Sequence, residues 1–159
     1  MRYTNENFFS IIGHISVFFS TWDVLTSLLI IRLVKRQSPL PILNRKTLGQ
    51  KLKLLGGLAP TDVVDPALLG RVQLALPEAL LVAEKRNRFI HDQWLFAEEK
   101  ITTGEIGLLS VEVVVGSEGR TANMAPTNFH ITELYTFLET VGKQQTIFHG
   151  LLESLPVSN

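Results

Sequence analysis

The sequence predicts a mainly α-helical protein, a bundle of four or five helices with a small β-hairpin inserted before the last helix. Two observations support this fold class. Apolar residues recur every three or four positions from Phe8 to Val34 and again from about Thr132, which is the period of an amphipathic helix. Between these segments, the valine-rich run Ile106–Val115 leads into Gly-Ser-Glu-Gly, which is typical of a strand and a tight turn.

The first helix is expected to cover residues 8–34 and to bury a wide stripe. The stripe consists of Phe8, Ile11, Ile15, Phe18, Trp22, Leu25, Leu29 and Leu33. The segment is long enough to span a bilayer. However, Asp23 lies near its centre, and no basic segment followed by a small-residue cleavage site accompanies it. We therefore expect a core helix and no membrane association.

Prolines and glycines divide the middle of the chain. Two prolines within residues 39–41 separate the first helix from a short helix, which should start near Thr47 and stop at the glycine pair 56–57. Pro66 can open a third helix, and Pro77 fits the first turn of a fourth. A single kinked helix is the alternative for these last two.

The hairpin insert should occupy approximately residues 94–129. Its strands are the run 106–115 and the polar run 120–128, and residues 94–101 are candidates for a third strand. Helical spacing then resumes from about Thr132 to the end of the chain.

Composition narrows the class of protein. A chain of 159 residues is expected to form one domain, residues 1–159, with a genuine core. Fifteen basic and fifteen acidic residues give zero net charge, so any contact with nucleic acid must depend on a local patch. The chain contains no cysteine, which excludes disulfides and thiolate metal sites and fits a cytoplasmic location.

The candidate functional residues lie in the segment 86–94, Arg-Asn-Arg-Phe-Ile-His-Asp-Gln-Trp. Asn87, His91 and Trp94 have the spacing i, i+4 and i+7, which places them on one face of a continued helix. Arg86 lies about 140° from His91 on such a helix, but its side chain is long. A guanidinium can bind a phosphate group, and an imidazole can transfer protons, so the two side chains together suit chemistry on a phosphate.

The pattern Arg-Asn-x-x-x-His at residues 86–91 resembles the signature of the HEPN domains, helical bundles that include RNA-cleaving toxins and defence proteins. The order of elements is also similar: a long first helix, a Thr-Leu-Gly segment (residues 47–49 here), the motif on an inner helix, a hairpin and a closing helix. Trp94 stands where an aromatic residue often follows the histidine. One position departs from the pattern, because Asp92 replaces a frequent glycine.

The resemblance implies a metal-independent endoribonuclease of the toxin or antiphage-defence type, which acts as a homodimer with a shared site. It assigns catalysis to Arg86, Asn87 and His91, with no metal and no cofactor. The ribose 2′-OH would attack the adjacent phosphorus and leave a 2′,3′-cyclic phosphate and a 5′-OH. RNA and a cognate antitoxin or nucleotidyltransferase-like protein are the partners that it suggests.

Other residues are candidates for RNA binding or for support. Seven basic residues lie between positions 32 and 53 without an acidic residue among them. From this segment and the motif we select Arg88, Lys35, Arg36, Arg45 and Lys46 as RNA-binding candidates. Trp94 and Asp23 are candidate supporting residues; Asp23 either pairs with Arg86 or Arg88 or is simply solvated.

The alternative hypothesis is that the protein is not catalytic. In it, Arg86 and Arg88 pair with Glu84 or Asp92, and His91 caps the end of a helix. The protein would then be an interaction or nucleotide-binding module of the same fold. Zero net charge and Asp92 favour this alternative, whereas the intact Arg, Asn and His favour the enzyme. The other histidines, His14, His130 and His149, have no familiar metal-binding spacing.

Overall fold

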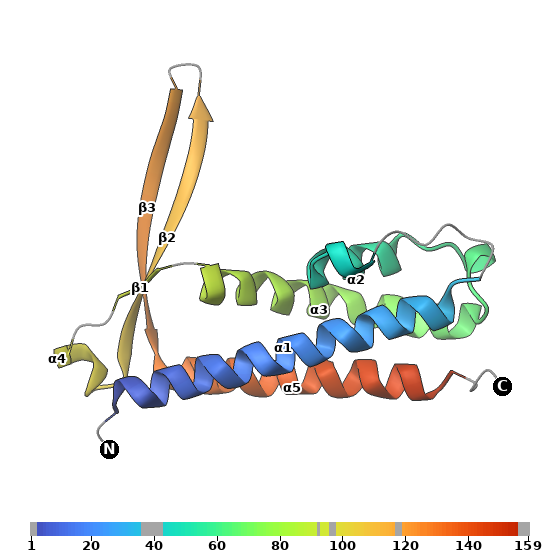
Figure 1. Cartoon of the computed structure of the whole chain (residues 1–159), viewed down its shortest axis with the longest axis horizontal. Coiled ribbons are helices and arrows are strands. Elements are labelled where there is room, and N and C mark those ends of the chain that lie inside the picture. Colours follow the sequence, from blue (N-terminus) through green and yellow to red (C-terminus); the bar gives the residue numbers. More distant parts are fainter. Residues whose placement is uncertain (1–2, 36–42, 92, 96–97, 117–118, 156–159) are drawn as a thin grey trace. The chain divides into compact units, whose positions relative to one another are not determined.

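The fold is described from a computed structural model (Figure 1). The described residues are 3–35, 43–91, 93–95, 98–116 and 119–155. Side chains are described for all of these except those at positions 87, 90, 91, 93, 98, 99, 110–116, 119–123 and 125.

The chain is mainly helical with a small three-stranded antiparallel sheet. The helices are α1 (Asn5–Leu33), α2 (Leu48–Gly56), α3 (Pro66–His91), α4 (Glu98–Ile101) and α5 (Ile131–Glu153), with 3-10 turns at Leu43–Arg45 and Pro60–Asp62. The strands are β1 (Gln93–Leu95), β2 (Glu105–Gly116) and β3 (Gly119–His130), in the order β1-β2-β3. The expected hairpin before the last helix is therefore confirmed, with residues 93–95 as the third strand.

Two compact units make up the chain. Unit 1 comprises Met1–His14 and Lys85–Glu139, and unit 2 comprises Ile15–Glu84 and Thr140–Asn159. The helices α1, α3 and α5 each contribute residues to both units.

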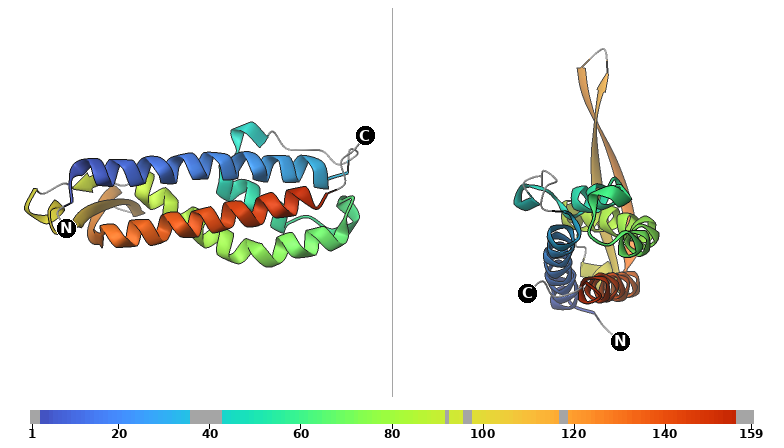
Figure 2. Two further views of the ribbon diagram at one scale, coloured as in Figure 1. Left: turned by 90° about the horizontal axis from the view of Figure 1, so that it is seen from below. Right: turned by 90° about the vertical axis from the view of Figure 1, so that its right-hand side faces the viewer.

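Unit 2 is helical, and its long helices lie side by side (Figure 2). Trp22 of α1 is fully buried, and its ring contacts Phe148 of α5 edge-on and Phe19 at a tilt. The expected stripe on α1 is buried with one exception: Phe18 is exposed and Phe19 takes its place in the core. Both are compatible with a period of 3.6, because Phe19 is four residues after Ile15 and three before Trp22.

The short helix α2 begins with a capping box. The Thr47 hydroxyl accepts from the backbone N–H of Gln50, and the Gln50 side chain accepts from the backbone N–H of Thr47. The helix ends at Gly56, as the glycine pair predicted. Of the two alternatives for residues 66–91, separate third and fourth helices are wrong and a single helix is confirmed, because α3 is one helix that contains Pro77. Packing of its apolar face outweighs the hydrogen bond that the proline cannot donate.

Unit 1 is built around an aromatic cluster. Phe89 of α3 is 1% exposed, and its ring contacts Trp94 of β1, Phe129 of β3 and Phe137 of α5. The strand β2 adds Ile106 and Leu108 to this core, and both side chains are buried.

Two helical segments, Asn5–Leu33 and Pro66–Arg86, are long and apolar enough to cross a membrane by length and composition alone. Core helices of soluble proteins meet the same criterion, so the segments do not establish a membrane location.

Candidate functional site

The candidate site lies at the C-terminal end of α3, within unit 1. The helix continues without interruption to His91, so positions 87 and 91 are one turn apart and only about 40° from each other around the axis. The side chains of Asn87 and His91 lie outside the described set, as does the whole of Asp92. The backbone therefore gives their positions on the helix and no contacts.

Phe89 fixes the orientation of this end of α3. Its ring is held by three other aromatic rings, and the Lys85 ammonium lies 5.8 Å from the Phe89 ring centroid and 5.4 Å from that of Phe137. Positions 87 and 91 each lie about 160° around the helix from Phe89. The face that carries the asparagine and the histidine is therefore turned away from the aromatic cluster that anchors the helix.

The two arginines of the segment have different environments. Arg86 lies about 60° from Phe89 and is half-buried, whereas Arg88 is exposed. Arg88 is about 60° from His91, compared with about 140° for Arg86. Within one copy of the chain, the arginine on the histidine's side of the helix is thus Arg88, which the sequence had placed among the RNA-binding residues.

Trp94 does not continue the helical face and lies instead in the third strand, the other position that the sequence suggested for it. The helix ends at His91, and Trp94 lies in β1. Its indole N–H donates to the carbonyl oxygen of Phe89 at 2.8 Å, and its ring stacks on Phe89 at a centroid distance of 5.9 Å. One of the last carbonyl groups of α3 thereby gains a donor, so Trp94 caps the helix end and extends the aromatic cluster.

Asp23 has a partner that the sequence did not identify. Its carboxylate accepts from the Lys51 ammonium at 2.6 Å, and Lys51 is only 3% exposed. Both residues belong to unit 2. The expectation of a simply solvated Asp23 is wrong, and its role is to compensate a buried lysine of α2.

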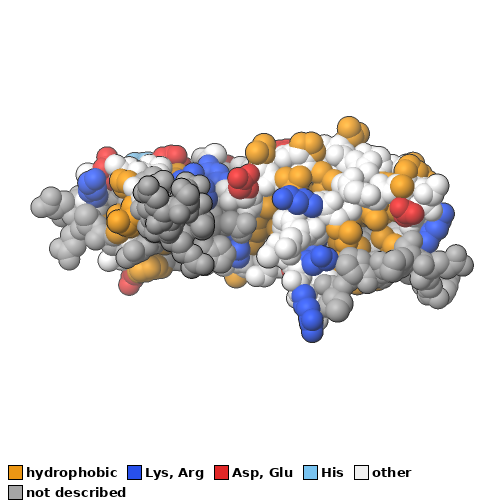
Figure 3. Space-filling model, turned by 90° about the horizontal axis from the view of Figure 1, so that it is seen from above, with side chains coloured by type: hydrophobic (Ala, Val, Ile, Leu, Met, Phe, Trp, Pro, Cys, Tyr) orange, Lys and Arg blue, Asp and Glu red, His pale blue; other side chains and the backbone are white. Residues whose placement is uncertain are grey.

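The structure buries one cation of the basic segment, Lys51, and leaves the other described cations of the segment exposed or half-buried. Lys51 forms the ion pair with Asp23. The Lys35 ammonium donates to the Thr61 carbonyl oxygen at 2.7 Å. Arg45 is exposed, Lys46 is half-buried, and Arg36 lies outside the described residues. On the face shown in Figure 3, Lys and Arg side chains lie singly among hydrophobic and polar ones.

The remaining histidines have structural settings. His130 precedes α5, with Nδ1 2.8 Å from the Thr132 hydroxyl and Nε2 3.1 Å from the Thr103 carbonyl oxygen. His149 Nδ1 lies 3.5 Å from Glu153 Oε2, one turn later on the exposed side of α5. His14 is exposed. Among the described residues, no group of three or more His, Asp or Glu side chains could hold a metal ion.

Comparison with protein-family models, with curated proteins and with solved structures finds no match for this chain. The residues of this chain are therefore the basis for assigning a function.

Proposed function

We propose that this protein is a metal-independent endoribonuclease of the HEPN type, which acts as a homodimer in toxin or antiphage defence. The observation that carries the proposal is the end of α3. The helix extends to His91, and Phe89 anchors it, so Asn87 and His91 share a face that is turned away from the aromatic cluster. The described residues on this side of the helix, Glu84 and Arg88, are exposed, which supports access by a substrate or a second copy.

The chemistry needs groups that move protons and a cation. The 2′-oxygen attacks the adjacent phosphorus and loses its proton, the bond from phosphorus to the 5′-oxygen breaks, and that oxygen gains a proton. An imidazole exchanges protons near neutral pH and can perform either transfer. One His91 cannot hold both positions at once, so a site shared by two copies supplies one imidazole as base and the other as acid.

The arginines would neutralise the charge that develops on the phosphorane oxygens. Arg88 lies nearer to His91 around the helix, and the half-buried Arg86 is the more restrained of the two. We assign charge stabilisation to Arg86, as the motif suggests, and RNA-backbone binding to Arg88. Asn87 would orient the histidine or donate to a phosphate oxygen.

A non-catalytic module of the same fold is the second candidate. The observations in its favour are the zero net charge and the burial of Lys51, whose ammonium is paired with Asp23 and so does not contribute to a cationic surface. In this case the end of α3 would bind a nucleotide or a protein, with no cleavage.

The test is cleavage of end-labelled single-stranded RNA by purified protein in the presence of EDTA. We expect cleavage that yields 2′,3′-cyclic phosphate ends, identified by mass spectrometry. His91→Ala should lower the rate by ~10²–10⁴-fold, because one proton-transfer group is lost. His149→Ala is the matched control, since His149 is exposed and remote in sequence from α3.

Dimerisation is measured for every variant by light scattering. If the wild-type protein dimerises but leaves all RNA intact, the non-catalytic module replaces the enzyme. If His91→Ala cleaves at the wild-type rate, the activity belongs to a contaminant or to another site.

A further inference from the structure

Much of the β-hairpin has no third strand beside it. β1 pairs with β2 only at residues 107–109, whereas β2 and β3 pair from Glu105↔His130 to Gly116↔Gly119. The part from Ser110↔Ala125 to the turn is therefore a two-stranded ribbon among the described elements, which we call the distal ribbon. A two-stranded ribbon is at best marginally stable in water, so its side chains are expected to pack against something.

The register divides the hairpin residues into two faces. One face, the outer face, carries the pairs Glu105/His130, Gly107/Asn128, Leu109/Pro126, Val111/Met124, Val113/Ala122 and Val115/Arg120. The opposite, inner face carries Ile106, Leu108 and Phe129 near β1, and then Ser110, Glu112, Val114, Thr121, Asn123 and Ala125 in the distal ribbon. Of these six distal positions four are polar, whereas five of the six distal positions on the outer face are apolar.

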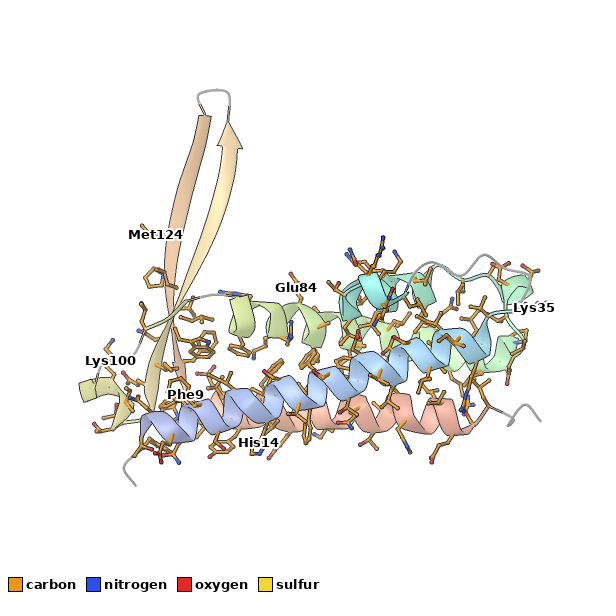
Figure 4. All side chains as sticks on the ribbon, viewed as in Figure 1. Phe9, His14, Lys35, Glu84, Lys100 and Met124 are labelled. Carbon is orange, nitrogen blue, oxygen red and sulfur yellow. The ribbon has the colours of Figure 1, made fainter. Side chains whose placement is uncertain are left out.

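Exposure agrees with this division at the described positions. Leu108 on the inner face is fully buried, whereas Met124 on the outer face is 66% exposed and Pro126 is also exposed. Met124 projects from β3 in Figure 4. Leu95 of β1, which pairs with Gly107 and so shares the outer face, is 41% exposed. Alternating apolar and polar residues normally mark a sheet with one covered face, and here the apolar side chains described on the outer face, Leu95, Met124 and Pro126, are exposed.

We infer that a second copy of this chain covers the outer face. The charges at its two ends support this occupant. Glu105, which is exposed, stands at the base of the face, and Arg120 stands near its tip. If two ribbons stack face to face and antiparallel about a two-fold axis, Arg120 of each copy comes opposite Glu105 of the other, and the apolar pairs meet in the middle.

The position of the axis also fits the end of α3. The midpoint between Glu105 and Val115 falls between the pairs Leu109/Pro126 and Val111/Met124. Gln93, two residues after His91, pairs with Leu109, so α3 ends beside this same level of the hairpin. The end of α3 and the midpoint of the outer face therefore lie at the same level along the hairpin, while α3 itself packs on the inner face through Phe89 and Phe129. This inference rests on the proposed homodimer but not on RNA cleavage.

Stacking of faces is favoured over pairing of edges. Pro126 lies in the edge strand β3 and removes one backbone donor, which weakens any strand that would pair along it. Edge pairing would also leave the outer face open.

Cross-linking tests the faces directly. Because the chain contains no cysteine, a single introduced cysteine can link only two copies. Packed sheets lie about 10 Å apart, which exceeds the reach of a disulfide, so a short bis-maleimide is the reagent. We expect Met124→Cys to give covalent dimers and the neighbouring Asn123→Cys, on the inner face, to give few. Equal yields from the two variants, or none from Met124→Cys in a dimeric protein, would overturn the inference, as would a wild-type protein that is monomeric at tens of micromolar.

A charge exchange tests the antiparallel arrangement. Arg120→Glu and Glu105→Arg each place like charges together at both ends of the interface, and each should weaken dimerisation about 3- to 10-fold. The double variant E105R/R120E should restore the wild-type dissociation constant in sedimentation. Losses that simply add in the double variant would contradict the arrangement. If the exchange restores dimerisation while no variant cleaves RNA, the proposed function fails and the interface stands.

Discussion

A lysine that is almost completely buried requires a compensating charge, and in the described part of the chain the Asp23 carboxylate supplies it for Lys51. Its ammonium lies 2.6 Å from Asp23, whose side chain is 36% exposed. Breaking such a pair from one side leaves the other charge uncompensated, and the cost is greater for the partner that water cannot reach.

We therefore expect Asp23→Asn to destabilise the protein more than Lys51→Met. Asp23→Asn leaves a buried ammonium without a counter-charge and should lower the free energy of unfolding by roughly 2–4 kcal/mol. Lys51→Met leaves only a carboxylate that water reaches in part, and should cost about 1 kcal/mol or less. Urea denaturation of both variants and of the double variant measures the difference. Equal losses for the two single variants would mean that the pair does not control the effect.

At the scale of elements, Gly104 forms the turn before β2 and joins this turn by a hydrogen bond to the first residue of α5. It is the residue at which the chain turns from α4 into β2, with φ +89°, and its carbonyl oxygen accepts from the N–H of Ile131 at 2.7 Å. A β-carbon at this position would lie 2.8 Å from His130 Nε2 and 2.8 Å from the Tyr3 ring. Glycine is therefore required here both for its backbone conformation and for space.

Gly104→Ala should lower the free energy of unfolding by about 2–4 kcal/mol, because strain and overpacking act together. Gly150→Ala is the matched control, since a β-carbon there meets nothing within 4 Å in the helix α5. The control should instead be stabilised by about 0.5–1 kcal/mol. Thermal unfolding followed by circular dichroism compares the two. A neutral Gly104→Ala would show that the turn can rearrange without cost.

The sequence predicted those elements that local signals determine. The cap at Thr47, the glycines that end α2, and the valine run followed by glycines each act within a few residues, so α2 and the hairpin could be predicted. Pro77 was misleading because its local cost is outweighed by packing along a helix of 26 residues. Such packing depends on distant parts of the chain.

The candidate site was predictable in part for the same reason. The spacing of Asn87 and His91 needs only a helix, and α3 provides it. By contrast, Lys51 and Asp23 are 28 residues apart and nothing local connects them. No glycine or proline beside His91 signals the end of the helix. The stacking of Trp94 on Phe89 fixes this end instead, and no local pattern in the sequence indicates that contact. The valines at 111, 113 and 115 were the available signal for the outer face of the hairpin, although Val114 interrupts the alternation.

At the scale of the whole molecule, zero net charge makes the RNA affinity of this protein depend on a few local cations. Among the candidates of the basic segment, Lys35 and Arg45 are exposed and Lys46 is half-buried. Lys35 already donates to the Thr61 carbonyl oxygen, so Arg45 and Lys46 are the pair to test. If both neutralise RNA phosphates, Arg45→Glu/Lys46→Glu should weaken binding at low salt far more than at high salt. The slope of log affinity against log salt should fall by about 1.4, since each phosphate contact on single strands contributes about 0.7.

Fluorescence anisotropy with a labelled single-stranded RNA between low and moderate salt measures this slope. Lys143→Glu is a control at an exposed lysine of α5 outside the basic segment, and it should leave the slope nearly unchanged. An unchanged slope in the double variant would remove Arg45 and Lys46 from the RNA-binding surface and leave Arg88, Lys35 and Arg36 as the candidate cations.

The placement of the two tryptophans has a further consequence, for spectroscopy. Trp22 lies in the core of unit 2, and Trp94 lies half-buried against Phe89 in unit 1. Trp22→Phe thus leaves one intrinsic fluorophore that reports on unit 1, and Trp94→Phe leaves one that reports on unit 2. If the two emission signals lose their native wavelength at the same denaturant concentration, the units unfold as one cooperative block. Separate midpoints would make each unit its own foldon, and the end of α3 would open or close with unit 1 alone.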